Sequence, residues 1–271
     1  MALIFDEIGE WTEIKLEIIK KYAVVYSKIL SSKKNPSFTH VYIDAFAGSG
    51  INLSKRTGNF VLGSPLNALE VKPPFKEIFL IDLNGDKTQQ LREFTHTDPR
   101  VSVYSGDCNV ILLDDIFSKV KYEDYRRGLC LLDPYGLHLN WEVIEQAGHL
   151  GTIDLFLNFP VMDMNRTALW RNPEKVPYGT NRMTSFWGDE SWRSVAYKTV
   201  STLFGEWEEK TNNENIVNGF YERLKSIAGF KYVAEPIPMK NSIGAVVYYL
   251  FFASQQPVAK DIIKDIFNKY K

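Results

Sequence analysis

The stretch that decides the fold is Val41-Tyr-Ile-Asp44-Ala-Phe-Ala-Gly48-Ser-Gly50, an apolar run that ends in an acidic residue and a glycine-bearing loop. The run predicts a buried strand, and the glycines predict a tight turn in which main-chain N–H groups can approach a ligand. The loop departs from the G-x-G-x-x-G spacing of a dinucleotide site. A carboxylate here repels phosphate but attracts ammonium and sulfonium groups, and S-adenosylmethionine carries both. We therefore predict that Asp44, Phe46, Gly48 and Gly50 bind this cofactor; the alternative is a purely structural turn.

Short apolar runs alternate with helical stretches through the first half of the chain. These runs are Val41–Ala45, Glu77–Ile81, Val101–Ser105, Gly128–Leu132 and Ile153–Phe159. The alternation predicts a parallel sheet with helices on both faces. A last pair of runs, Lys231–Pro236 and Ala245–Phe252, lacks a helix-length connection and predicts an antiparallel hairpin. The predicted fold class is α/β: a doubly wound, mostly parallel, seven-stranded Rossmann-like sheet with an antiparallel edge hairpin and a small Trp-rich cap insertion.

Two segments do not follow this alternation of strands and helices. Residues 1–36 contain an amphipathic helix, which we expect to pack on the core with Lys15, Glu17 and Lys21 on the face opposite its apolar side chains. Residues 37–271 are expected to form one domain, with 163–213 as a cap or inserted subdomain. Trp187 in this cap is a candidate substrate contact, although a small Trp-rich core is the commoner explanation of such a residue.

Composition excludes several other classes of protein. A chain of 271 residues with 45% apolar content can bury one sizeable core. Its net charge of −1 gives no global signature of nucleic-acid binding. The chain lacks a bilayer-length apolar run and the pattern of a signal peptide, so we expect a cytoplasmic protein that has no membrane partner. Cys108 and Cys130 lack paired metal-ligand spacing, and we expect no metal site.

Carboxylates follow two more of the predicted strands. Asp82 ends the second strand and could accept hydrogen bonds from two ribose hydroxyls. Asp107 ends the third strand and could accept from the exocyclic amine of adenine, with Cys108 beside the base. Ligands of open α/β sheets bind outside the carboxyl ends of the strands, so these residues are predicted to line the same crevice. Each aspartate taken alone is equally well explained as a helix N-cap.

The turn after the fourth strand, Asp133-Pro134-Tyr135-Gly136, supplies the candidate catalytic residues. Asp133 and the Pro134 carbonyl could accept hydrogen bonds from an exocyclic NH₂ group, while Tyr135 stacks on its ring. Gly136 and Asn158, which lies near the end of the fifth strand, are further candidates to contact the methyl acceptor. The alternative is an ordinary Asp-Pro-x-Gly reverse turn.

With these motifs the chain resembles the three-Cys-motif partner (TcmP) proteins, a branch of the class I S-adenosylmethionine-dependent methyltransferase superfamily. The matching residues are Tyr42–Gly48, Gly63–Pro65, Gly106–Asn109, Asp133–Gly136 with Trp141, Asp154, Asn158–Pro160, Phe186–Gly188 and Trp192. The resemblance implies that the Asp44–Gly50 loop contacts the methionine part of the cofactor, that Asp82 binds ribose and that Asp107 approaches adenine. It also implies a partner protein with three cysteines.

Asp133–Gly136 is similar to the Asp-Pro-Phe-Gly turn of tRNA guanine dimethyltransferases, which implies an exocyclic amine in RNA or DNA as the acceptor. This turn has one proline, where other amino-methyltransferases of nucleic acids have two. The leading hypothesis is an S-adenosylmethionine-dependent methyltransferase acting on such an amine. Two alternatives stay open: a non-catalytic module that docks a partner protein, and a methyltransferase acting on a small molecule or a protein.

Overall fold

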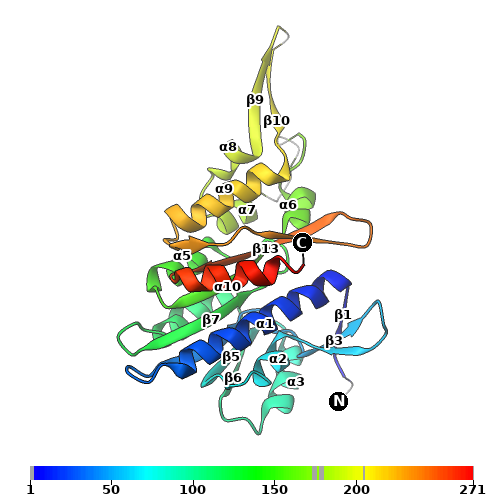
Figure 1. Cartoon of the computed structure of the whole chain (residues 1–271). Coiled ribbons are helices and arrows are strands. Elements are labelled where there is room, and N and C mark those ends of the chain that lie inside the picture. The colour runs from blue at the N-terminus through cyan, green and yellow to red at the C-terminus, as the bar shows by residue number, and fades with distance from the viewer. Residues whose placement is uncertain (1–2, 173–175, 177–179, 204, 271) are drawn as a thin grey trace.

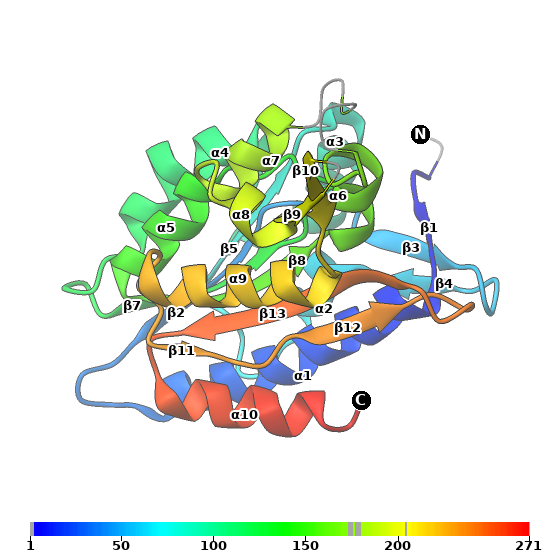
Figure 2. The ribbon, with the colours of Figure 1, turned by 90° about the horizontal axis from the view of Figure 1, so that it is seen from above.

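The computed structural model describes residues 3–172, 176, 180–203 and 205–270, so the expected cap range 163–213 is described in part. Within these ranges an eight-stranded sheet runs through the molecule, with helices on both of its faces (Figures 1 and 2). The strand order is β11-β13-β8-β7-β2-β5-β6, and β12 also pairs with β13.

Five neighbouring strands are parallel, and each overlaps one of the five apolar runs expected from the sequence. They are β2 (Thr39–Asp44), β5 (Glu77–Asp82), β6 (Val101–Ser105), β7 (Arg126–Leu132) and β8 (Ile153–Phe159). Each face of the sheet packs against its own hydrophobic core, and consecutive side chains of a strand alternate between the two. In β2, Val41 and Ile43 pack on one face of the sheet, and Tyr42 packs on the other. Both faces of β2, β5, β7 and β8 are therefore buried, which explains the nearly continuous apolar character of these strands. β6, at the edge of the sheet, is partly exposed.

The antiparallel edge differs from the expected two-stranded hairpin. β13 (Val246–Ser254) pairs with β8 on one side. On its other side it pairs with both β11 (Tyr232–Val233) and β12 (Ile237–Lys240). The segment Ala234–Pro236 separates these two short strands, so the sheet has eight strands in the described ranges where the sequence predicted seven.

The helices divide between the two faces (Figure 2). One face carries α1 (Glu10–Ser32), α2 (Ser64–Leu69), α3 (Gly85–Thr95) and α10 (Pro257–Phe267). The other carries α4 (Cys108–Ile111), the π-helix η1 (Leu112–Ile116), the 3₁₀-helix η2 (Phe117–Lys119), α5 (Trp141–Leu150) and α9 (Asn213–Ser226). α6 (Val161–Thr167), α7 (Thr180–Trp187) and α8 (Trp192–Ala196) complete this second layer.

Two smaller β-structures were not expected from the sequence. β1 (Asp6–Ile8), β3 (Ile51–Ser54) and β4 (Phe60–Leu62) form a three-stranded sheet. Of these strands, β3 begins directly after the glycine loop. β9 (Tyr197–Thr202) and β10 (Gly205–Lys210) form a ribbon that projects from the body of the molecule (Figure 1). None of the helices in the described ranges is long and apolar enough to span a bilayer.

Candidate active site at the strand ends

The strand order creates a crevice between β2 and β7. From β2 the chain continues outward to β5 and β6, and then returns to the other side of β2 to form β7 and β8. Such a topological switch point is where open α/β sheets bind ligands. Asp44 of β2 pairs with Leu131 of β7, and this register places the loops after the two strands side by side.

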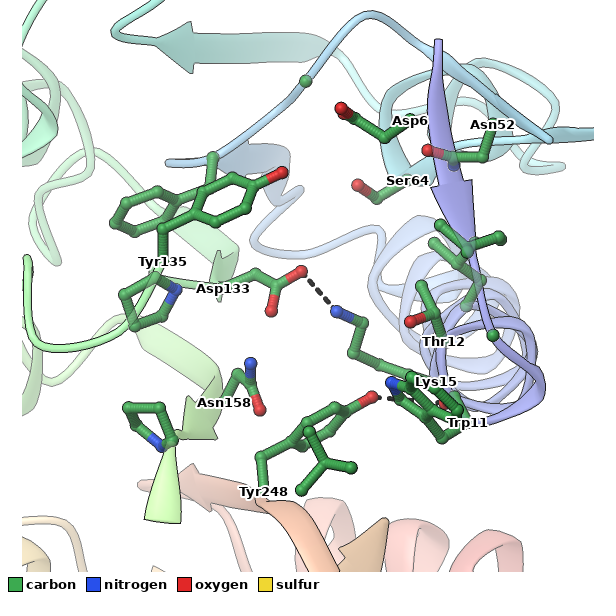
Figure 3. A pocket seen from close by; sticks show the side chains of 18 of the residues that line it. Asp6, Trp11, Thr12, Lys15, Asn52, Ser64, Asp133, Tyr135, Asn158 and Tyr248 are labelled. Atoms are coloured by element: carbon green, nitrogen blue, oxygen red, sulfur yellow. Dashed lines mark hydrogen bonds and ion pairs between the residues drawn. The ribbon is translucent and has the colours of Figure 1, made fainter. Parts of the chain in front are cut away.

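A cavity of about 490 Å³ lies at this switch point, and Figure 3 shows its lining. It brings together eight of the residues predicted from the sequence, which are Phe46, Gly48, Gly50, Asp133, Pro134, Tyr135, Gly136 and Asn158. The loops after β2 and β7 and the end of β8 therefore form one continuous wall. Asp44, Asp82, Asp107, Cys108 and Trp187 are not among the lining residues.

The glycine loop has the backbone conformation that its composition predicts. Gly48 and Gly50 have φ angles of +65° and +89°, a region that side chains with a Cβ rarely adopt. The Gly48 N–H donates to the Asp82 carboxylate at 2.8 Å, and the Gly63 N–H donates to the Gly50 carbonyl at 2.7 Å. Asp82 therefore holds the loop itself in place.

Asp44 lies beneath the loop, fully buried. Burial raises the pKa of Asp44 to about 7, although hydrogen bonds from Ser64 and from the Phe46 N–H oppose the increase. Its side chain also accepts from the Tyr42 hydroxyl at 3.4 Å. This carboxyl group thus stands behind the loop and supports it from within the core.

Replacing Asp44 with asparagine is expected to cost more stability at pH 5 than at pH 8. The folded-state pKa of about 7 lies above the usual 3.8, so the folded protein holds a proton that the unfolded chain releases. The stability contributed by this proton is present at low pH and is lost as the pH rises through about 7. One pKa unit corresponds to about 1.4 kcal/mol. Between pH 5 and pH 8, the difference in free energy of unfolding between wild type and variant should therefore shrink by up to about 3 kcal/mol.

Chemical denaturation of both proteins at the two pH values measures this difference. Burial lowers the pKa of His40 to about 4, and this group titrates in the opposite sense. Its contribution is common to both proteins and cancels in the comparison. A cost of substitution that does not change with pH would contradict a buried carboxyl group that is protonated below neutrality.

The other predicted cofactor residues and Trp187 have local partners. Asp107 caps α4, its side chain accepting from the N–H of Asn109 at 2.9 Å. Burial, followed by the charge of Asp107, raises the pKa of the Cys108 thiol to about 12, which keeps it uncharged. Trp187 is 1% exposed and donates its indole N–H to Ser191 at 2.9 Å, so it belongs to the core in this conformation. Within the described ranges no group of three His, Cys, Asp or Glu side chains is placed to hold a metal ion.

The turn after β7 presents its carboxylate to the cavity. One oxygen of Asp133, Oδ2, accepts a hydrogen bond from the Lys15 ammonium group (Figure 3). Tyr135 is 68% exposed, with the Lys87 ammonium 5.9 Å from the centre of its ring. Gly136 has a φ of +58°, and a Cβ there would lie 2.3 Å from the Asp163 carboxylate.

Asn158 contributes an unusual feature to the same wall. Its side chain is 8% exposed, and its Oδ1 atom is buried without a hydrogen-bond partner in the described part of the chain. A buried carbonyl oxygen without a partner costs free energy, and most such atoms in proteins are satisfied. Asn158 lines the cavity, but its Oδ1 atom is buried behind the cavity surface.

Sequence reasoning missed the contribution of the N-terminal segment and of β13. Asp6, Trp11, Lys15 and Tyr248 also line the cavity, and Figure 3 shows them opposite the turn. Lys15 was expected on the solvent face of the helix, and this was wrong: it is 4% exposed and lies on the buried stripe. Its spacing four residues after Trp11 and three before Ile18 is the signal that could have shown this.

No family model matches the chain, and no curated protein does. Among solved structures, LPL1258 from Legionella pneumophila is 13% identical with a TM-score of 0.51, over 94% of this chain and 92% of that one. TYW2 from M. jannaschii, solved with AdoMet, is 12% identical with a TM-score of 0.39, over 90% and 76%. The putative methyltransferase yhhF from Escherichia coli is 14% identical with a TM-score of 0.36, over 86% of each chain. The first likeness shows a shared fold alone, and the other two carry no argument about this chain.

Proposed function

We propose that this protein is an S-adenosylmethionine-dependent methyltransferase that acts on an exocyclic amine of a nucleobase in RNA or DNA. The observation that carries the proposal is that the Asp133 turn, whose carboxylate oxygen Oδ1 has no hydrogen-bond partner within the described ranges, lines one cavity with the glycine loop. A cavity that offers oxygen acceptors beside a glycine loop suits an N–H donor bound next to a cofactor.

The residues of the loop fit the proposed cofactor. The positive φ angles at positions 48 and 50 favour glycine, which has no side chain. A ligand can therefore contact the main chain of the loop at Gly48 and Gly50. Phe46, Gly48 and Gly50 would hold S-adenosylmethionine, which supplies an already activated methyl group. Positioning of the acceptor then provides most of the acceleration.

The opposite wall suits a neutral amine. Asp133 Oδ1 has no hydrogen-bond partner within the described ranges, and together with the Pro134 carbonyl it can accept N–H donors. Hydrogen bonds to its N–H groups leave the nitrogen lone pair directed at the methyl donor. The open oxygen of Asp133 can then take the proton that the amine sheds, and the exposed ring of Tyr135 can stack on the base.

Calorimetric titration with S-adenosylmethionine tests the cofactor pocket. Gly48→Val is expected to weaken binding by about tenfold or more, because the new side chain would enter the cavity and strain the loop. Gly58→Val is the matched control: Gly58 has a φ of +68° in the turn between β3 and β4, and no atom of the described residues lies within 4 Å of an added Cβ. Equal weakening in both variants, or no binding by the folded wild type, would contradict the proposed pocket.

The acceptor class requires a second experiment. Tritium from labelled S-adenosylmethionine should enter the RNA or DNA pool of a cell extract, and the protein and metabolite pools should stay unlabelled. Label that enters only protein or metabolites would support the alternative acceptors and refute the nucleobase.

The projecting ribbon favours a second function, the docking of a partner protein such as one with three cysteines. Leu203 at its tip is fully exposed, and Trp207 of β10 is 51% exposed. An isolated two-stranded ribbon with exposed apolar side chains gains stability when another protein covers it. If Trp207→Ser prevents co-purification of such a partner while cofactor binding is unchanged, docking takes place at the ribbon.

A further inference from the structure

Lys15 is a buried lysine with one anionic partner. Its side chain is 5% exposed, and its ammonium group donates to Asp133 Oδ2. The ammonium also lies 5.4 Å from the centre of the Tyr248 ring, whose hydroxyl donates to the Trp11 carbonyl at 3.2 Å. Burial, followed by the charge of Asp133, raises the pKa of Tyr248 well above its usual value, so the phenol is neutral. Among the described residues the counter-charge of Lys15 is therefore the proposed catalytic carboxylate.

Helix α1 does not need this ion pair for anchorage. Ile18, Ile19, Tyr22 and Ala23 of the helix are buried in the core on this face of the sheet. Tyr22 also donates to Asp154 at 2.6 Å. A buried ion pair contributes about as much stability as apolar side chains of similar volume, or less, because both charges lose their hydration. A lysine at this position is thus better explained by what it does to Asp133.

We propose, on the basis of the proposed methyl transfer, that Lys15 is a positioning residue that orients the Asp133 carboxylate toward the acceptor amine. The ammonium engages Oδ2 and leaves Oδ1 without a partner in the described chain. Oδ1 can then accept a hydrogen bond from the amine.

An alternative role for Lys15 is that of a plug, a side chain that occupies the acceptor's place on Asp133 and blocks the cavity. The unpartnered Oδ1 of Asp133 argues against this role. A plug would engage both carboxylate oxygens. Lys15 engages only Oδ2 among the described contacts, and the Asp133 side chain is still 27% exposed. Lys15 reaches Asp133 from the α1 side of the cavity, and Tyr248 lies beside it (Figure 3). Room therefore remains on the Asn158 side for an acceptor.

The test measures tritium transfer from S-adenosylmethionine to bulk RNA and to heat-denatured genomic DNA, at saturating cofactor. Lys15→Met is expected to slow transfer by about a hundredfold. Its affinity for S-adenosylmethionine should stay within about threefold of the wild type. Its melting temperature should change little, because the Asp133 side chain that loses its partner is 27% exposed and can be hydrated. Lys15→Arg, which keeps the positive charge, should recover most of the rate. Lys20→Met is the matched control, since Lys20 is exposed on the same helix and pairs with Glu70 at 2.8 Å.

A double-mutant cycle separates positioning from a structural role. If Lys15 acts through Asp133, then Lys15→Met combined with Asp133→Asn is no slower than Asp133→Asn alone. Rates that multiply would overturn the inference, as would full activity of Lys15→Met or a loss of rate that accompanies a lower melting temperature. Failure of the proposed function gives a different result: the wild type itself labels neither pool, and the role of Lys15 is refuted together with it.

Discussion

Asp133→Asn is expected to slow methyl transfer by about a hundredfold or more while S-adenosylmethionine binds almost as tightly as to the wild type. The substitution preserves the shape of the side chain and removes the charge that accepts the amine N–H. It also leaves the Lys15 ammonium buried without its counter-ion, so a lower melting temperature is expected as well. Single-turnover transfer of tritium, together with calorimetric titration of the cofactor, measures the two effects separately.

The matched control for this prediction is Asp163→Asn. Asp163 lines the same cavity, but its carboxylate is held by Arg166 at 2.5 Å. We expect its transfer rate to stay within a few-fold of the wild type, because this carboxylate does not belong to the Asp133 turn. Retained turnover in Asp133→Asn would remove Asp133 from the catalytic role, whatever the cofactor affinity.

Gly148→Ala is expected to cause the largest loss of stability, about 3 kcal/mol or more. A Cβ at this position in α5 would lie 1.9 Å from the carbonyl oxygen of Ala228 and 2.8 Å from its carbonyl carbon. Both atoms belong to the backbone that follows α9, so the clash requires one of these two segments to move. Urea denaturation of the variant measures the loss.

Gly151→Ala provides the comparison for this prediction. Gly151 follows the same helix with a φ of +70°, and in the described part of the chain no atom lies within 4 Å of an added Cβ. The substitution should therefore cost only the backbone strain, about 1 kcal/mol. If the two variants lose similar stability, the close approach of α5 to Ala228 is not tight.

The N-terminal segment forms part of the candidate site and is more than a helix packed on the core. Asp6 of β1 forms an ion pair with Lys87 of α3 at 2.6 Å, and both Asp6 and Lys15 reach the cavity. β1 also pairs with β3, immediately after the glycine loop. Removal of residues 1–15 would therefore take away one wall of the candidate site as well as a surface contact.

The sequence alone determined the parallel strands, because each is an apolar run followed by polar or glycine residues. Burial on both faces requires that pattern in β2, β5, β7 and β8. The sequence also determined that the glycine loop and the Asp133 turn follow strands of one parallel sheet, and the ends of such strands meet at one edge. The edge β-structure was predicted less well, since a pair of residues such as Tyr232–Val233 is too short for periodicity to reveal.

Only the tertiary structure decided which carboxylates face the cavity. The spacing of Asp44, Asp82 and Asp107 in the sequence is the same whether these side chains bind a ligand or the backbone. In the structure, Asp82 accepts a hydrogen bond from the Gly48 N–H, and Asp107 accepts one from the Asn109 N–H at the start of α4. The pairing of Lys15 with Asp133 joins residues 118 positions apart. Local sequence carries no information on such a contact, because it depends on how α1 packs across the sheet next to β13.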